Sequence, residues 1–160
     1  KAEGWLPDPS AVGFDFLAAV VPLAAASVDR LDEVPARLRF LFDYSAARAL
    51  EDPSVRAEAD AARPVIAALA DVLADGTSLV DRDTFRAAVA LVRERTGQKG
   101  KSLLHPIRLA LTGEGEGLEL DLAVPAIERG GALGASGLRP ILSAAERATT
   151  FYQRLGELHR

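Results

Sequence analysis

The sequence contains no cysteine, no methionine and only two histidines among its 160 residues. Without cysteine, the chain can form neither a disulfide scaffold nor a thiolate zinc site. His105 and His159 lie 54 positions apart, so no histidine pair has metal-binding spacing. Because an initiator methionine is missing, we expect a fragment of a longer protein.

Long apolar runs and a secretion signal are missing as well. No uninterrupted apolar stretch approaches the roughly 20 residues that a helix needs to cross a bilayer. The N-terminus lacks a signal peptide's order of positive charge, apolar block and small-residue cleavage site. We therefore expect a cytoplasmic protein that does not contact membranes.

The sequence does have enough apolar content for a packed core. Hydrophobic residues make up 49% of the chain, and the net charge is only −4. This composition excludes low-complexity disorder. The length suits one domain or two small helical subdomains.

Apolar residues recur at helical spacing along most of the chain, and no alternating run is long enough for a β-sheet. We therefore predict an all-α fold with two small helical subdomains. The expected organisation is an extended lead-in at 1–13, a helical subdomain at 14–80 and a C-terminal helical subdomain at 81–160. The segment Thr77–Asp81 is the expected joint between the two subdomains.

Proline, glycine and capping residues predict the limits of individual helices. Pro22 either separates two short helices or kinks a single one. Asp83 is the predicted N-cap of a helix that ends at Thr96-Gly97. Pro106 is the predicted start of the next helix, which Gly113 ends.

Positive charge is concentrated in the second half of the chain. Residues 1–81 carry a net charge of −7, whereas residues 82–160 carry +3. Five cations and a single anion, Glu94, lie between Arg93 and Arg108. Such a stretch attracts a phosphate-bearing partner, because fixed cations release counterions from a polyanion. A solvated basic loop is the alternative that charge alone leaves open.

Several short motifs fail the spacing that a catalytic site requires. Gly97–Ser102 ends like a phosphate-binding loop, but Arg95 stands where the first glycine is needed. The glycines of 113–117 lack dinucleotide-binding spacing, and 134–137 is not a nucleophile elbow. His105 has no serine or cysteine motif to serve as a base, so we interpret it as a packing or surface residue. The sequence therefore predicts no active site.

One stretch, Thr96–Gly113, resembles a signature near the C-terminal end of bacterial-type glutamyl-tRNA synthetases. Members of that family carry a Gly-x-Lys-x-Gly-Lys-like segment, then Pro-Leu-Arg-x-Ala-Leu-Thr-Gly, then a loop ending in Gly-Pro. Arg37–Tyr44 resembles the family's aromatic-acidic stretch, so the resemblance spans roughly residues 14–125. The residues of the signature that match outright are Pro106, Arg108, Ala110, Leu111, Thr112 and Gly113, with Ile107 in place of leucine.

The resemblance implies an anticodon-binding helical bundle. In that family the C-terminal helical region binds the tRNA anticodon stem-loop, and an N-terminal catalytic domain activates glutamate with ATP and Mg. The family's ATP signatures, His-x-Gly-His and Lys-Met-Ser-Lys-Ser, are absent from this chain. We therefore expect a chain without cofactor or catalytic activity of its own. Its expected partners are glutamate tRNA and the catalytic domain of a parent glutamate–tRNA ligase.

The resemblance also assigns candidate RNA contacts. Arg108 is the position that contacts an anticodon base, and a guanidinium suits this role because it presents five donors in a rigid fork. Thr112 and the loop Glu116-Gly117-Leu118 would line the same pocket. Lys99 and Lys101 would contact backbone phosphates without reading the base sequence.

Two departures from the family pattern leave an alternative open. Gly117-Leu118 replaces the family's Gly-Pro, and the chain continues beyond Val124, where the family usually closes with a Leu-Leu-Gly helix. These departures agree with a divergent member or a paralogue of the family. The missing Gly-Pro and the acidic first half slightly favour the alternative, a helical protein-interaction module of a synthetase paralogue that no longer reads tRNA. Salt separates the two hypotheses, because RNA binding through cations weakens steeply with salt and an apolar protein contact does not.

Overall fold

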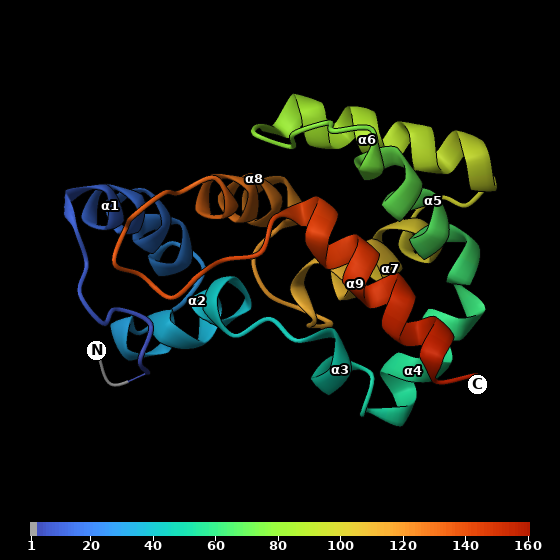
Figure 1. Cartoon of the computed structure of the whole chain (residues 1–160), viewed down its shortest axis with the longest axis horizontal. Helices are drawn as coiled ribbons and strands as arrows, with labels where there is room; N and C mark the ends of the chain where they lie inside the picture. The colour runs from blue at the N-terminus through green and yellow to red at the C-terminus, as the bar shows by residue number, and fades with distance from the viewer. Residues whose placement is uncertain (1–2) are drawn as a thin grey trace.

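The chain is built from helices (Figure 1). The computed structural model describes residues 3–160, and within this range it contains α-helices, one short 3-10 helix and no strand. This confirms the predicted all-α fold. None of these helices has the length and apolar composition that a membrane crossing requires. The elements are α1 (Ala11–Ala25), η1 (Leu31–Glu33), α2 (Val34–Phe42), α3 (Ala46–Ala49), α4 (Pro53–Ala61), α5 (Arg63–Ala74), α6 (Arg82–Thr96), α7 (Lys101–Thr112), α8 (Leu120–Gly131) and α9 (Ala144–Glu157).

Glycines end two helices where the sequence predicted it. Gly97 and Gly113 adopt the left-handed conformation, with φ of 70° and 73°, directly after α6 and α7. Glycine is favoured at such positions because a Cβ atom would be strained at positive φ. Of the two alternatives for Pro22, the structure has the single helix, since α1 continues through it to Ala25.

Two predicted helix starts are wrong. The N-cap of α6 is Asp81 and not Asp83, because the Asp81 carboxylate accepts the Thr84 N–H at 2.8 Å. Helix α7 begins at Lys101, so Pro106 lies inside the helix rather than at its start. Proline removes one intrahelical hydrogen bond there. Its ring is nevertheless buried, so the packing of α7 keeps the helix continuous.

The N-terminal segment is held against the rest of the molecule. Residues 3–10 are not helical, and α1 begins at Ala11, three residues earlier than predicted. The Ser10 N–H donates to the carbonyl of Ser136, in the loop between α8 and α9, at 2.8 Å. The indole N–H of Trp5 donates to the Asp43 carboxylate at 3.0 Å. These bonds fix the lead-in to two distant parts of the chain.

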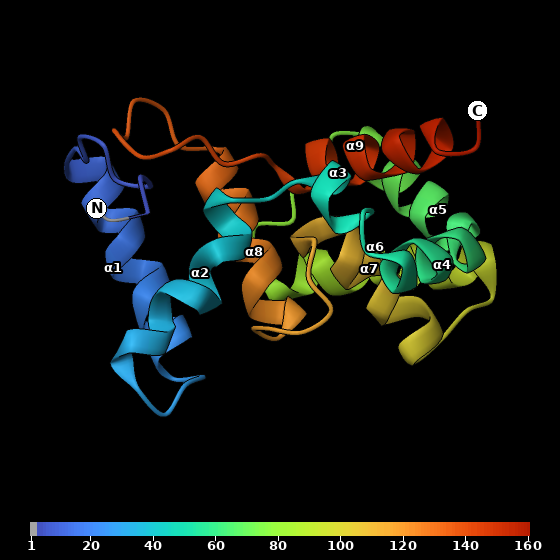
Figure 2. The ribbon, with the colours of Figure 1, turned by 90° about the horizontal axis from the view of Figure 1, so that it is seen from below.

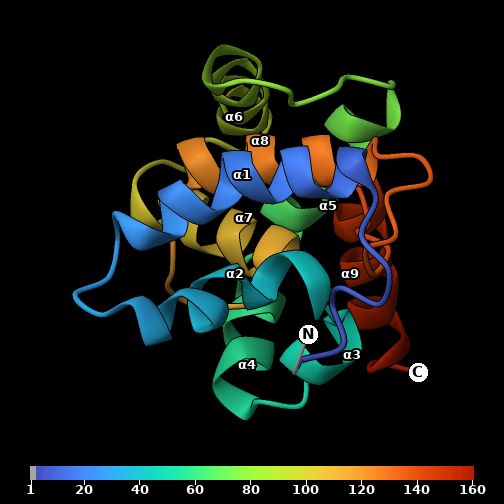
Figure 3. The same cartoon turned by 90° about the vertical axis from the view of Figure 1, so that its left-hand side faces the viewer.

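The helices form two groups that do not follow the order of the sequence (Figures 1 and 2). Helix α5 packs against α6, α7 and α9 at one end of the molecule. Helices α1, α2 and α8 pack together at the other end, where α1 lies across the face of α8 (Figure 3). The predicted division into subdomains at residues 80/81 stays a prediction. In the structure, α8 belongs to the second predicted subdomain but contacts α1 and α2, which belong to the first.

Helix α7 has one buried side and one open side. Its sequence places Leu103, Ile107, Leu109, Ala110 and Leu111 in the core. This burial stabilises α7 against α5 and α9, because removing apolar surface from water is the main favourable contribution to folding. The opposite side presents the polar residues Lys101, His105 and Arg108 from a rigid support.

A fully buried arginine connects α9 to the C-terminal ends of α2 and α7. The Arg147 guanidinium donates to the carbonyls of Phe40 at 2.6 Å, Leu41 at 2.9 Å and Leu111 at 3.0 Å, and its Nε donates to Leu142 at 2.9 Å. Carbonyls in the last turn of a helix lack intrahelical partners and carry partial negative charge. One cation therefore satisfies the ends of two helices.

Tyr44 covers this cation. The Arg147 guanidinium carbon lies 4.6 Å from the centre of the Tyr44 ring, which is within the range of a cation–π contact. The Tyr44 hydroxyl lies 2.7 Å from the Ala110 carbonyl, another acceptor in the last turn of α7. Burial lowers the pKa of Arg147 to about 10, so the side chain remains charged at neutral pH.

A buried carboxylate holds the segment between α5 and α6. Glu128 on α8 accepts the Leu79 N–H and the Ala144 N–H, each at 2.8 Å, and the Ser78 hydroxyl at 3.1 Å. Ala144 is the first residue of α9, where a negative charge is favoured by the helix dipole. Glu128 thus fixes both the predicted joint and the start of the last helix.

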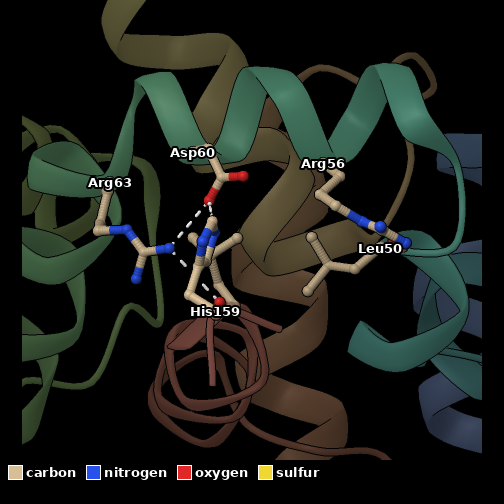
Figure 4. A network of polar contacts seen from close by, with 6 residues as sticks. Leu50, Arg56, Asp60, Arg63 and His159 are labelled. Carbon is tan, nitrogen blue, oxygen red and sulfur yellow. Dashed lines mark hydrogen bonds and ion pairs between the residues drawn. The ribbon is translucent and has the colours of Figure 1, made fainter. Parts of the chain in front are cut away.

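The end of α9 is attached to α4 through a small polar network (Figure 4). Asp60 on α4 lies 2.9 Å from the Arg63 guanidinium and 2.6 Å from Nε2 of His159. Arg63 also donates to the Leu155 carbonyl at 3.4 Å. The hydrogen bond from His159, followed by that from Arg63, lowers the pKa of Asp60 despite some desolvation.

We expect this network to make the free energy of unfolding fall as the pH is lowered into the acid range. A carboxyl whose pKa is lowered in the folded state stabilises the fold at pH values above its unfolded pKa of about 3.9, and this contribution is lost as the pH falls through the folded pKa. Asp60→Asn should therefore lower the urea midpoint more at pH 6 than at pH 3. Asp71→Asn, at an exposed position on α5, is the matched control. An equal effect of Asp60→Asn at both pH values would contradict this prediction.

Candidate nucleic-acid interface

Arg108 lies on the open side of α7 at the edge of a hollow of about 370 Å³. The hollow is bordered by α6, α7 and the start of α8, and Lys101 and His105 also line it. The Arg108 side chain is half-buried, and its Nη1 donates a hydrogen bond to the Leu118 carbonyl at 2.9 Å. A guanidinium has five N–H donors, so most of its donor capacity remains for a ligand.

The electrostatics around Arg108 strengthen it as a donor. Burial lowers its pKa, and the nearby carboxylate of Glu114 opposes this shift. Burial also raises the pKa of Glu114, opposed by the charges of Arg39, Arg108 and Arg37. Arg108 stays protonated because even a lowered arginine pKa remains far above neutrality. A partly desolvated cation makes stronger hydrogen bonds than one in bulk water.

Thr112 holds the loop that follows α7. Its side chain is 4% exposed, and its hydroxyl lies 2.8 Å from the Arg108 carbonyl and 3.1 Å from the Glu114 carbonyl. The same hydroxyl accepts the Glu114 N–H at 3.1 Å. The structure therefore gives Thr112 a role in shaping the loop, and direct contact with RNA stays a prediction.

Leu118 is likewise turned into the core, with a side chain that is 4% exposed. Its carbonyl is the group that accepts from Arg108. Glu116 is exposed, and Gly117 has a φ of 147°, which favours glycine over other residues. Only Glu116 of these three positions presents a side chain to solvent.

His105 connects the same loop to α4. Its Nδ1 contacts the Glu58 carboxylate, and its Nε2 lies 3.0 Å from the Gly115 carbonyl. These contacts agree with the interpretation of His105 as a packing residue. The loop 113–118 is thus held at three points by side chains of α7, namely those of His105, Arg108 and Thr112.

A second hollow, of about 620 Å³, lies on the other side of this loop. Glu116 and Gly117 line it together with Arg37 on α2 and the turn 26–29 after α1. The sequence analysis did not predict that this turn approaches the loop. No local signal could have shown it, because the contact joins segments that are about 90 residues apart in sequence.

The two predicted phosphate contacts lie in different places. Lys101 is exposed and lines the hollow of Arg108. Lys99 is exposed in a neighbouring groove between α6 and α7, together with Arg86 and Arg93. The structure thus places Lys101 and Arg108 in one hollow, whereas Lys99 lines the adjacent groove and Glu116 lines the second hollow.

The groove residues Arg86 and Arg93 were missed as candidates. Their spacing could have revealed them, since Arg82, Arg86 and Arg93 follow the i, i+4, i+11 pattern of a single helix face. Among residues 3–160, no group of three or more histidine and carboxylate side chains could hold a metal ion. The hollow of Arg108 offers a ligand the cations Lys101 and Arg108 and apolar surface, beside the carboxylates of Glu119 and Asp121.

The chain is similar to known proteins over most of its length. Residues 2–130 match the model of a family described as an anticodon binding domain. The glutamate–tRNA ligase of Frankia casuarinae is 30% identical over 154 residues, which cover 89% of this chain and 28% of that protein. The glutamate–tRNA ligase of Synechococcus sp. is 36% identical over 134 residues, which cover 80% of this chain and 26% of that protein.

Matches over shorter segments have higher sequence identity. Glutamate–tRNA ligase 1 of Chelativorans sp. is 49% identical over 49 residues, which are 31% of this chain and 11% of that protein. This chain spans about a quarter of the length of the two relatives that match most of it. No solved structure matches the chain significantly.

Proposed function

Because this chain belongs to the anticodon-binding domain family, we propose that it is the part of a glutamate–tRNA ligase that binds the tRNA anticodon. The observation that carries the proposal is Arg108, which is half-buried beside Lys101 and makes a single side-chain hydrogen bond within residues 3–160. Glutamate tRNA is the proposed partner, since the relatives that match most of the chain are glutamate–tRNA ligases.

The proposed recognition uses the hollow on the open side of α7. A splayed anticodon base would enter it and meet the Arg108 fork along its hydrogen-bonding edge. Leu104, which is 42% exposed, offers apolar surface to the base or ribose. Lys101 would neutralise an adjacent phosphate. The rigid packing of α7 reduces the entropic cost of placing these groups.

Catalysis is proposed for another part of the parent protein. A catalytic domain that binds ATP and Mg would join glutamate to the tRNA held by this chain. Such a ligase would act in the cytoplasm. The residues of this chain take no step in that chemistry, and their proposed role is to position the anticodon stem-loop.

The direct test is titration of two RNA stem-loops with the purified chain. One carries the glutamate anticodon, and the other has one changed anticodon base. We expect tighter binding of the first at every salt concentration, with the affinity for both falling linearly on a logarithmic salt scale. Equal affinity for the two stem-loops would exclude anticodon reading by this chain.

Lys99→Ala should lower the affinity for both stem-loops without changing the preference for the glutamate anticodon. A lysine that contacts a phosphate contributes a sequence-independent charge, so its loss should weaken both stem-loops together and reduce the salt slope by about one unit. The measurement is the same pair of titrations at two salt concentrations. A change in the ratio of the two affinities would mean that Lys99 contacts a base instead.

A protein contact is the second candidate function, and the outer face of α1 favours it. Phe14 is 58% exposed and Val21 38% on one side of a helix that is apolar nearly all round, and Val12, which is 49% exposed, lies on the opposite side. A helix of this composition is normally covered by other protein. The catalytic domain of the parent is the proposed partner for this face. Binding of the catalytic domain that does not depend on RNA and does not weaken with salt would support this candidate over the first.

A further inference from the structure

The groove between α6 and α7 collects cations around an apolar floor. Arg86, Arg93 and Lys99 line a hollow of about 250 Å³ whose floor includes Val89 and the 42%-exposed Leu104. Over residues 82–101 the sequence has six cations and two anions, although the whole chain carries a net charge of −4. Positive charge is therefore concentrated at this surface.

The other hollows beside the candidate site contain carboxylates. Glu119 and Asp121 line the hollow of Arg108, and Glu33 and Glu114 line the hollow beside Gly117. By contrast, no described residue that lines the α6–α7 groove is acidic. Helix α7 also starts at the groove, and its N-cap residue has no side chain to satisfy the first N–H groups. The groove thus presents a net positive surface.

We propose that the α6–α7 groove binds the sugar-phosphate backbone of the RNA next to the anticodon. The proposal rests on the proposed function and adds to it a second contact, on α6, that the base-reading hollow does not contain. Charge complementarity selects this occupant, because fixed cations on a protein release counterions from a polyanion. The apolar floor fits a ribose, whereas it offers nothing to a free inorganic anion.

The spacing of the two sites fits one continuous RNA strand. Leu104 borders both the groove and the hollow of Arg108. The groove begins at Gly100, eight residues before Arg108, which corresponds to about 12 Å along a helix. One unpaired RNA strand can therefore pass from the hollow of Arg108 over Leu104 into the groove.

The three cations are not equivalent. Arg86 donates to the Asp121 carboxylate at 2.8 Å, and Arg82 lies 3.4 Å from the same group. Part of the charge of Arg86 is therefore compensated. Arg93 and Lys99 are exposed and carry most of the expected interaction with phosphate. Arg93 is the better test, because it lies on α6, away from the loop and from Arg108.

The experiment compares Arg93→Ala with Arg48→Ala, which removes an exposed arginine of α3 outside the groove. We expect Arg93→Ala to weaken binding of both stem-loops by about 3- to 10-fold and to reduce the salt slope by about one unit. The preference for the glutamate anticodon should stay unchanged. Arg48→Ala should match the wild type, and circular dichroism should show normal helix content for both variants.

The outcomes separate this proposal from the proposed function. If Arg93→Ala binds both stem-loops like the wild type while the wild type still prefers the glutamate anticodon, the groove proposal is overturned and the function stands. If polyglutamate displaces the stem-loops from the wild type as effectively as unlabelled stem-loop does, the groove does not select RNA backbone and the proposal also fails. If the wild type binds neither stem-loop, both proposals are overturned.

Discussion

Arg147→Ala should lower the free energy of unfolding by about 3–5 kcal/mol, the range for removing a buried charged group on which other buried groups depend. The substitution leaves the buried carbonyls of Phe40, Leu41 and Leu111 without this donor, and also removes the partly buried bond to Leu142. Each buried acceptor that loses its partner costs roughly 1–3 kcal/mol. A loss of this size is a large share of the ~5–15 kcal/mol by which a typical domain is stable.

The measurement is urea unfolding followed by circular dichroism. Arg154→Ala is the matched control, because it removes the same charge from an exposed position on the same helix, and it should cost less than about 0.5 kcal/mol. Arg147→Lys should recover little stability, since an ammonium cannot reach four carbonyls with a planar fork. Similar losses for Arg147→Ala and Arg154→Ala would show that the buried hydrogen bonds do not stabilise the fold.

Arg108→Ala should weaken binding of the glutamate anticodon stem-loop by about 1–3 kcal/mol, the range for a base-reading arginine. It should also flatten the preference over a stem-loop with a changed anticodon base. The physical reason is that the guanidinium lies at the edge of the hollow with a single bond, to Leu118, formed within residues 3–160. The measurement is titration of both stem-loops at one salt concentration.

A second variant separates base reading from loop support, because Arg108 also holds the loop through the Leu118 carbonyl. Arg108→Lys keeps a donor for that carbonyl but lacks the planar fork. We expect it to retain the loop and overall affinity while losing most of the preference. If Arg108→Lys discriminates between the stem-loops as well as the wild type does, charge alone is sufficient and Arg108 does not read a base edge.

The helices were predictable from the sequence because their signals are local. Apolar spacing and the capping glycines Gly97 and Gly113 depend on neighbours within one or two turns. The predicted starts of α6 and α7 were wrong because local signals alone do not decide them. Asp81 and Asp83 both suit an N-cap, and the choice depends on the geometry of Thr84. Pro106 is tolerated inside α7 because its ring is buried, which periodicity alone does not reveal.

The candidate site was predictable only in part. Arg108 and Lys101 were identified, and the structure brings them to one hollow. Thr112 and Leu118 were expected at the surface of the pocket, but the fold of the loop 113–118 turns them inward. A single sequence match gives the position of a residue along the chain, whereas the direction of its side chain depends on what packs against the loop.

The sequence by itself determined that this protein is an all-α chain with a basic segment near α7 and without thiolate or paired-histidine chemistry. These properties follow from residue types and short-range periodicity. Only the tertiary structure decided which helix ends meet at Arg147 and which cations share a groove. Arg147 stands alone on an otherwise apolar stripe of α9, so the sequence could mark it as unusual but could not supply its partners. Those partners are carbonyls of α2 and α7, which are between about 35 and 110 residues away along the chain and are brought close by the burial of apolar surface.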